Sequence, residues 1–84
     1  MHFVYLLRSQ KDGGLYIGRS DDLKRRLASH NDGLVDSTAD RRPLEIVYYE
    51  AYIDARLANE RERKLKEFGS AYTGLLKRLD FKEK

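Results

Sequence analysis

The side chains with the clearest chemical potential lie mostly in residues 15–30, with the sequence LYIGRSDDLKRRLASH. They are Tyr16, Arg19, Arg26 and His30, to which the chain adds Tyr5 before this segment and Glu62 after it. Guanidinium groups bind anions, and phenol and imidazole groups can accept or donate protons. A carboxylate can bind a metal ion. The types and spacing of these residues predict that they gather on one side of the molecule.

Most of these residues also have a purely structural interpretation. Tyr5 and Tyr16 are good strand residues, since tyrosine suits a half-buried sheet. Arg26 could cover the core with its aliphatic stem, and His30 could pack at a helix end, where the helix dipole favours its charge. Arg19 could be an ordinary exposed arginine. On pattern alone, the structural and the functional interpretation both stay open for these five residues.

Glu62 departs most from the local pattern. On a helical wheel it falls between Ala55 and Ala58, at the edge of the arc that is predicted to face inward. A carboxylate in that position is costly unless it is paired or bound to a metal. An arrangement with Arg61, or pairing with Lys66 four residues later, would satisfy it as well as a metal ion would.

Two strands are predicted to position the tyrosines. Residues 2–8, HFVYLLR, are apolar on both alternating faces, which is typical of a central strand. Turn residues at 9–14 and a second apolar run at 15–18 complete a β-hairpin. In this second strand Tyr16 and Gly18 share a face.

A helix is predicted to follow the hairpin and to position the next two residues. Ser20 is a favourable N-cap, and Asp21 and Asp22 suit the first turn of a helix. The helix is predicted to end near His30. Because Arg26 and His30 are four residues apart, they are predicted to lie together on one edge of the apolar stripe.

The rest of the sequence predicts a third strand and two more helices. The segments are a loop over residues 35–42, a strand over 44–52, and helices over 55–67 and 71–79. Asp54 and Ser70 are the predicted N-caps of the two helices. The side chains predicted to face inward are Ala55, Leu57, Ala58, Leu65 and Phe68 in the first and Leu75, Leu76 and Leu79 in the second. The order ββαβαα predicts one α/β (α+β) domain over residues 1–84.

Composition narrows the class of protein. The 84 residues contain no cysteine, which excludes disulfides and thiolate metal sites. Charged residues make up 37% of the chain and the net charge is +3, a mildly basic balance that permits a polyanionic partner. The longest apolar run, residues 3–7, is too short to cross a membrane. Since the first residues do not resemble a secretory signal, we expect a cytoplasmic protein without a membrane partner.

Several other chemistries lack their motifs. The pair Gly13-Gly14 is isolated and carries no P-loop lysine. His2 and His30 lack a helical zinc-ligand spacing, and no serine has an identifiable base and acid partner. The thin apolar stripes and mixed charges argue against a helix that binds a membrane surface.

At these residues the chain resembles the GIY-YIG nuclease family, in particular its small stand-alone (YhbQ-like) branch. The second family motif stands as Tyr16-Ile17-Gly18, and the first stands in degenerate form as Phe3-Val4-Tyr5. Further matches follow in order: Gly18-Arg19-Ser20, Leu23, Arg26-Leu27, His30-Asn31-Asp32-Gly33, Thr38, Arg42-Pro43-Leu44, Tyr49-Glu50, Ala58, Arg61-Glu62 and Leu65-Lys66. The resemblance covers roughly residues 3–68. Its main departure is Phe3, which replaces the glycine of the first motif.

The resemblance implies a three-stranded antiparallel sheet flanked by helices, and a role for each residue of the site. Tyr16 would help to deprotonate the attacking water, with Tyr5 as its companion near the scissile phosphate. Arg26 would hold the phosphate. His30 stands where other branches carry tyrosine or histidine, and Arg19 stands where many relatives have lysine.

The same resemblance implies a metal site and a nucleic-acid surface. Glu62 would be the single carboxylate that binds a divalent metal, Mg²⁺ or Mn²⁺. The side chains expected to contact the substrate, mostly at flanking phosphates, are Arg19, Lys24, Arg25, Lys64 and Lys66. Such contacts would make binding depend on salt.

The resulting hypothesis is a metal-dependent endonuclease that hydrolyses phosphodiester bonds in DNA by direct attack of water. The expected substrate is a repair- or recombination-type structure or a single strand, and a protein partner could supply specificity. The alternative is a catalytically silent module of the same fold that binds nucleic acid or a partner. Metal binding at Glu62 separates the two hypotheses.

Overall fold

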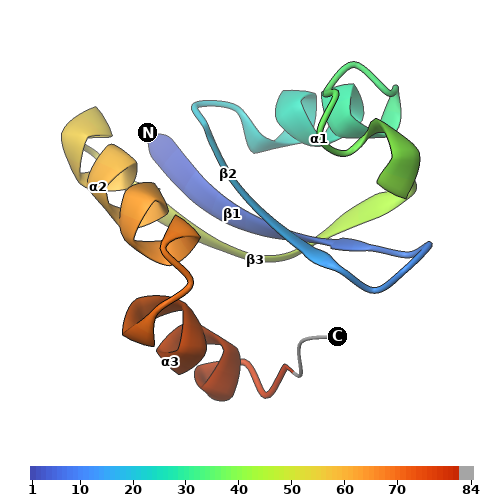
Figure 1. Cartoon of the computed structure of the whole chain (residues 1–84). Helices are drawn as coiled ribbons and strands as arrows, with labels where there is room; N and C mark the ends of the chain where they lie inside the picture. The colour runs from blue at the N-terminus through green and yellow to red at the C-terminus, as the bar shows by residue number, and fades with distance from the viewer. Residues whose placement is uncertain (82–84) are drawn as a thin grey trace.

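A three-stranded antiparallel sheet forms the frame of the molecule (Figure 1). The computed structural model describes residues 1–81. The strands are β1 (His2–Ser9), β2 (Leu15–Ser20) and β3 (Leu44–Tyr52), and the helices are α1 (Leu23–Asn31), α2 (Ala55–Lys66) and α3 (Ser70–Arg78), with a 3₁₀ turn at Ala39–Arg41. The strand order is β2-β1-β3. The predicted order ββαβαα and the predicted fold class are therefore confirmed.

Strand β1 takes the central position because its side chains are apolar on both faces. Val4 and Leu6 belong to the cluster that packs against α2 and α3, whereas Tyr5 and Leu7 belong to the cluster under α1. Figure 1 shows α1 and α3 on opposite faces of the sheet. All four side chains are buried. The alternation of successive side chains along a strand thus divides the core into two layers.

Each face of the sheet has its own apolar cluster. The larger cluster joins the sheet to α2 and α3 and contains Val4, Leu6, Ile17, Ala58, Leu65, Tyr72, Leu75 and Leu76. The smaller cluster lies under α1 and contains Tyr5, Leu7 and Leu44, with Tyr16, Leu23, Leu27 and Ile46 packed against it. No helix among the described residues is long and apolar enough to cross a membrane.

The first helix begins later than the sequence predicted, because the capping residue is Asp22 and not Ser20. The Asp22 carboxylate accepts a hydrogen bond from the Arg25 backbone N–H at 3.0 Å. The Ser20 hydroxyl accepts from the Asp22 N–H at 3.0 Å and so belongs to the turn before the helix. Serine and aspartate are both favourable N-cap residues and both occur in turns, so the sequence alone does not show which of Ser20 and Asp22 caps the helix.

Two predictions for α2 and one for α3 were wrong. Leu57 is half exposed on the outer side of α2, and Phe68 is 61% exposed, so neither side chain faces inward. Phe68 lies beyond the end of α2 and has a φ of 55°. Its side chain therefore does not continue the inward-facing arc of the helix. The residue that caps α3 is Gly69, without a side-chain hydrogen bond, and Ser70 is the first residue of that helix. Tyr72 of α3 is buried although the sequence pattern did not indicate it.

Candidate functional site

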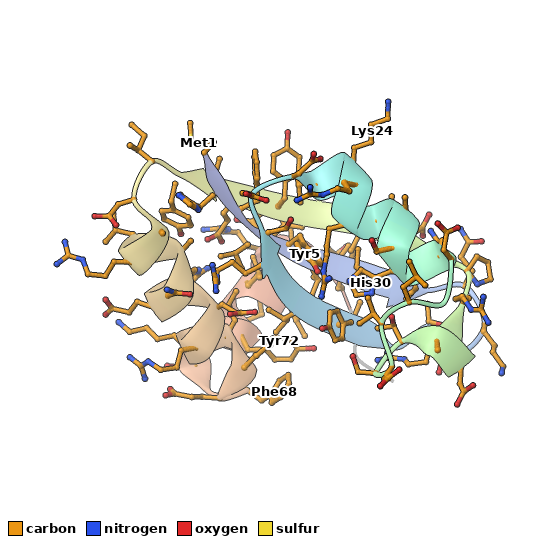
Figure 2. All side chains as sticks on the ribbon, turned by 90° about the horizontal axis from the view of Figure 1, so that it is seen from above. Met1, Tyr5, Lys24, His30, Phe68 and Tyr72 are labelled. Atoms are coloured by element: carbon orange, nitrogen blue, oxygen red, sulfur yellow. The ribbon has the colours of Figure 1, made fainter. Side chains whose placement is uncertain are left out.

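The predicted catalytic residues from β1, β2 and α1 meet on the face of the sheet that α1 covers. In the register of the hairpin, Tyr5 pairs with Gly18 and Leu7 pairs with Tyr16, so both tyrosines point to the same face. The side chain of His30, in the last turn of α1, reaches down to this face and is fully buried. Tyr5 and His30 lie next to each other between the sheet and α1 (Figure 2).

A chain of buried hydrogen bonds runs through His30. The Tyr5 hydroxyl lies 2.9 Å from His30 Nε2, and His30 Nδ1 lies 2.7 Å from the Thr38 hydroxyl. The Thr38 hydroxyl donates to the Val35 carbonyl oxygen at 3.4 Å. Because that hydroxyl has a single proton, it accepts from His30 Nδ1–H, which leaves Nε2 to accept the proton of Tyr5. The network therefore orients Tyr5, His30 and Thr38 in one direction.

The pKa shifts of Tyr5 and His30 agree with a hydrogen bond that Tyr5 donates to His30 Nε2. Burial lowers the pKa of His30, and the positive charge of Arg26 lowers it further, so the imidazole is neutral at pH 7. Burial raises the pKa of Tyr5, while a hydrogen bond and the charge of Arg26 lower it. Tyr16 and Glu62 raise the same pKa, which places their charges in the electrostatic environment of the Tyr5 phenol.

Tyr16 contacts the other side of the imidazole. Its ring meets the His30 ring edge-on, with centroids 5.1 Å apart and an angle of 67° between the planes. Tyr5 meets the same imidazole at 5.9 Å and 78°. Tyr16 is only partly buried, whereas Tyr5 is 2% exposed. His30 is thus held between a buried phenol and one nearer to the surface.

Gly18 leaves the space that Tyr5 occupies. A Cβ atom at position 18 would lie 2.3 Å from both Cζ and the hydroxyl oxygen of Tyr5. Real Cβ atoms do not approach another atom so closely. The glycine of the second family motif is therefore required here by the close approach of the Tyr5 ring to the backbone of β2, and not by an unusual φ.

Arg26 presents an unsatisfied polar atom to the site. Its Nε is the one side-chain nitrogen or oxygen in residues 1–81 that is buried without a hydrogen-bond partner. Buried polar groups are normally paired, so an orphaned N–H of a guanidinium group indicates an anionic or water partner. The positive charge of Arg26 acts on both Tyr5 and His30, so its guanidinium group lies near the hydrogen-bonded pair.

Glu62 approaches the site from α2 and is held by two cations. One carboxylate oxygen lies 3.5 Å from Arg19 Nε, and the other lies 3.2 Å from Lys66 Nζ. The predicted alternative of pairing with Lys66 is thus confirmed, whereas Arg61 contacts a different acid. The Glu62 side chain is 20% exposed, and both cations are more exposed than the acid. The carboxylate is therefore paired but not sealed off from solvent.

The donor set at Glu62 suits a weakly held, hard cation. No group of three or more histidine, cysteine, aspartate or glutamate side chains that could hold a metal occurs in the part of the chain that the structure describes. Mg²⁺ commonly keeps several waters and binds through one or two carboxylates together with substrate phosphates. A single carboxylate beside a phosphate site fits Mg²⁺ or Mn²⁺ in this way, and it does not fit a structural zinc site.

The residues predicted to contact flanking phosphates are divided between two surfaces. Lys24 and Arg25 are exposed on α1, where Lys24 points away from the sheet (Figure 2) and Arg25 pairs with Asp21 at 3.3 Å. Arg19 and Lys66 lie beside Glu62. The second pair is therefore close to the candidate metal ligand, whereas the first pair lies on α1, which covers the other face of the sheet from α2.

Two functional partners were not found by reasoning from the sequence. Thr38 completes the hydrogen bonds of His30. It lies in a loop without periodicity, and the only sequence signal for it is its match to the family. The partner of Arg61 was also missed. Glu50 on β3 accepts three hydrogen bonds from this guanidinium, at 2.9, 3.2 and 3.0 Å, and others from the hydroxyls of Tyr48 and Tyr52.

This cluster, Tyr48, Glu50, Tyr52 and Arg61, ties α2 to β3. Arg61 holds the pKa of the Glu50 carboxyl below its usual value against the opposing effect of burial. Burial and the adjacent carboxylate raise the pKa of Tyr52 to about 12. The cluster is therefore a charged core with Glu50 ionised and both phenols protonated, and it fixes the helix that carries Glu62.

Comparisons with known proteins match most of the chain. A family model described as the GIY-YIG catalytic domain matches residues 1–74. A UPF0213 protein of Bacillus pumilus is 39% identical over 66 residues, which cover 77% of this chain and 66% of that protein. A UPF0213 protein of Staphylococcus epidermidis is 40% identical over 68 residues, which cover 80% of this chain and 82% of that protein.

A solved structure is similar over most of the fold. The solution NMR structure of a UPF0213 protein from Bacillus halodurans has a TM-score of 0.57 and 29% identity, and the match covers 93% of this chain and 83% of the other. The resemblance recognised in the motifs of the sequence is thereby confirmed. The chain belongs to the GIY-YIG catalytic domain family, whose members are generally nucleases.

Proposed function

We propose that this protein is a metal-dependent endonuclease that hydrolyses phosphodiester bonds in DNA. The observation that carries the proposal is the buried, unpartnered Nε of Arg26 beside the hydrogen-bonded pair of Tyr5 and His30. A phosphate oxygen would satisfy this N–H, and the guanidinium fork matches the geometry of phosphate. The same group of side chains therefore offers an anion-binding guanidinium and a proton-transfer pair.

The proton-transfer step is assigned to Tyr5 and His30. A free phenol at pH 7 costs about 4 kcal/mol to ionise, and burial makes ionisation of Tyr5 harder still. We infer that Tyr5 does not rest as a phenolate, but passes its proton to His30 Nε2 while it accepts a proton from the attacking water. Neutral His30 with an accepting Nε2 is the form that this transfer needs.

This assignment exchanges the roles that the family resemblance suggested for the two tyrosines. Tyr16 was expected to deprotonate the water, but the hydroxyl with a proton acceptor behind it is that of Tyr5. Tyr16 contacts the imidazole only through its ring. We therefore assign Tyr16 to positioning the substrate and His30, and Thr38 to fixing the tautomer of His30.

The remaining charges neutralise the phosphate and the leaving oxygen. Glu62 would hold Mg²⁺ or Mn²⁺, which would supply Lewis-acid stabilisation of the charge that develops on the phosphate and the leaving oxygen. Arg26 holds the phosphate, and Arg19 lies beside Glu62 at the mouth of the site. Lys66, which pairs with Glu62 at 3.2 Å, would contact a substrate phosphate if a cation took its place at the carboxylate.

A cleavage assay with matched variants tests the proposal. Wild-type protein should cut single-stranded and branched DNA in Mg²⁺ and stop in EDTA. Glu62→Gln and Tyr5→Phe should each lower the rate by at least 10²-fold, since both remove a group used in the transition state. Glu60→Gln is the control, because Glu60 lies on the same helix and pairs with Lys64 as Glu62 pairs with Lys66. Cleavage that survives both active-site variants would disprove the mechanism.

A titration that does not depend on turnover separates the enzyme from a silent binding module. Mn²⁺ binding followed by calorimetry or electron paramagnetic resonance should be detected in the wild type and in Glu60→Gln, and lost in Glu62→Gln. If the wild type binds DNA but neither binds Mn²⁺ nor cuts any substrate, the module hypothesis is correct and the nuclease proposal falls.

A further inference from the structure

A pocket beside the candidate active site is not used by the mechanism above. It has a volume of about 370 Å³ and lies along the outer strand β2, next to the end of α2. Its lining residues are Leu15, Tyr16, Ile17, Arg41, Lys66 and Phe68. Two of them, Tyr16 and Lys66, also belong to the site, so the pocket is continuous with the place where we expect the phosphate. Its size is in the range of small-molecule sites, roughly 300–1,000 Å³.

Phe68 is the unusual member of this lining. Its φ is 55°, in the left-handed region, and the only other non-glycine residue in 1–81 with a positive φ is Asp80. A bulky side chain in this conformation costs free energy, and glycine is the usual residue at this position after a helix. The chain does contain a glycine, Gly69, but one residue later and with a negative φ.

Packing does not explain why phenylalanine occupies this position. The ring meets Tyr72 perpendicularly, with centroids 4.9 Å apart, yet Phe68 remains 61% exposed. The contact with buried Tyr72 holds the ring at the rim of the pocket without removing it from solvent. An exposed aromatic ring, held in place in the same pocket as Tyr16, is available to a flat ligand.

Two cationic side chains, Lys66 and Arg41, also line the pocket. The ammonium group of Lys66 pairs with Glu62 at 3.2 Å and is half exposed, so it can turn towards a phosphate. The Arg41 guanidinium donates to the Leu15 carbonyl oxygen at 3.2 Å and lies 3.8 Å from the Asp12 carboxylate, contacts that fix it at the other end of the pocket. An aromatic surface between positive groups is the pattern that proteins use for single nucleotides of an unpaired strand.

We propose that this pocket holds an unstacked base of the nucleic-acid strand, with Phe68 as the stacking surface and Lys66 and Arg41 facing the adjoining phosphates. The inference rests on the proposed function, because it places the base next to the bond that the site cuts. A base in the pocket must leave the base stack, so unpaired nucleotides enter at a lower cost than those of a perfect duplex. Phe68 is then a specificity-determining residue.

The decisive variant is Phe68→Gly. Glycine removes the ring but is favoured at a φ of 55°, so the backbone is expected to keep its conformation. Phe68→Trp keeps an aromatic surface and should preserve or increase affinity. Ile53→Gly is the control, since Ile53 is also an exposed apolar side chain, 86% exposed against 61% for Phe68, and lies in the turn between β3 and α2. Thermal melts of all variants verify that they are folded.

Binding is measured without metal, so that turnover is not needed. A labelled single-stranded oligonucleotide containing 2-aminopurine is titrated in EDTA, with anisotropy as the readout of affinity and quenching of 2-aminopurine as the readout of stacking. Phe68→Gly should weaken binding by roughly 5- to 100-fold and remove the quenching, because one base–aromatic stack accounts for such a change. Phe68→Trp and Ile53→Gly should retain both signals.

The outcomes distinguish this inference from the proposed function. If the wild type cuts DNA and Phe68→Gly has unchanged Kd, KM and quenching, the pocket assignment is overturned and the nuclease proposal stands. If binding and quenching depend on Phe68 but the wild type cuts nothing with Mg²⁺ or Mn²⁺, the pocket assignment is supported and the nuclease proposal is overturned. Loss of affinity in Ile53→Gly equal to that in Phe68→Gly would also overturn the assignment.

Discussion

Replacing Gly18 by alanine should damage the site and the core together. The added Cβ would lie 2.3 Å from Cζ and the hydroxyl oxygen of Tyr5, whereas ordinary contacts begin at 3.4 Å. The Tyr5 ring must therefore retreat by about 1 Å, which is the scale of misplacement that can cost roughly 10²-fold in rate. Because Tyr5 is buried and bonded to His30 at 2.9 Å, the retreat must distort that hydrogen bond.

The expected magnitudes for Gly18→Ala follow from overpacking. Forcing an additional carbon into a filled core costs about 1–3 kcal/mol of unfolding free energy. In a domain of this size each kcal/mol lowers the melting temperature by roughly 4–8 °C. We therefore expect a clear fall in melting temperature and a loss of cleavage of about 10²-fold in protein that is still folded at the assay temperature.

Thermal melts and single-turnover cleavage on the same preparations measure both effects. Gly74→Ala is the control, because a Cβ at Gly74, inside α3, meets no atom within 4 Å. That variant should gain stability, by up to about 1 kcal/mol, from the better helix propensity of alanine. A difference in melting temperature of less than about 2 °C would correspond to well under 1 kcal/mol. If Gly18→Ala shows so small a difference and also cuts at the wild-type rate, the close approach of Tyr5 to β2 does not constrain the site.

Two further predictions concern charge. Burial and the charge of Arg26 lower the pKa of His30 below 6.5. As the pH falls through 6.5, the unfolded chain therefore binds more protons than the folded one, and the free energy of unfolding decreases. Denaturant titrations between pH 7.5 and 5.5, a window set by the imidazole, should show this loss in the wild type and a smaller one in His30→Gln; equal slopes would contradict it. Glu50→Gln should lower the unfolding free energy by about 1–3 kcal/mol, since Arg61 loses its charged acceptor. The pKa of Tyr52, now about 12, should fall in the same variant, as an ultraviolet titration would show, and an unchanged value would contradict the role of Glu50.

The two faces of the sheet could be predicted from the sequence because they follow from local alternation. Residues 2–8 are apolar at alternate positions on both faces, and this period of two separates Tyr5 and Leu7 from Val4 and Leu6, as the two clusters of the structure do. The inward side of α2 was less predictable. A leucine such as Leu57 matches the apolar arc, but whether it meets the sheet depends on how the helix is rotated, which distant contacts decide.

The grouping of the candidate site was also predictable, but its supporting contacts were not. Tyr5, Tyr16 and His30 come together because strand pairing and helix spacing act over short distances in sequence. Thr38 and Glu50 join their partners across a loop and across the sheet, and neither sequence neighbourhood indicates the partner. Exposed Phe68 was misassigned for a related reason, since helix periodicity does not show where a helix stops.

The ion pair between Arg61 and Glu50 has a consequence for how the proposed metal ligand, Glu62, tolerates change during evolution. Arg61 and Glu62 are consecutive, and the first is anchored on β3 while the second reaches β2. Each added helical residue turns the chain by about 100° and advances it by about 1.5 Å. A length change between the anchor and the acid would therefore swing the carboxylate away from Arg19 of β2. Point substitutions on the outer side of α2 leave this alignment intact, so natural variation there should consist of replacements and not of insertions.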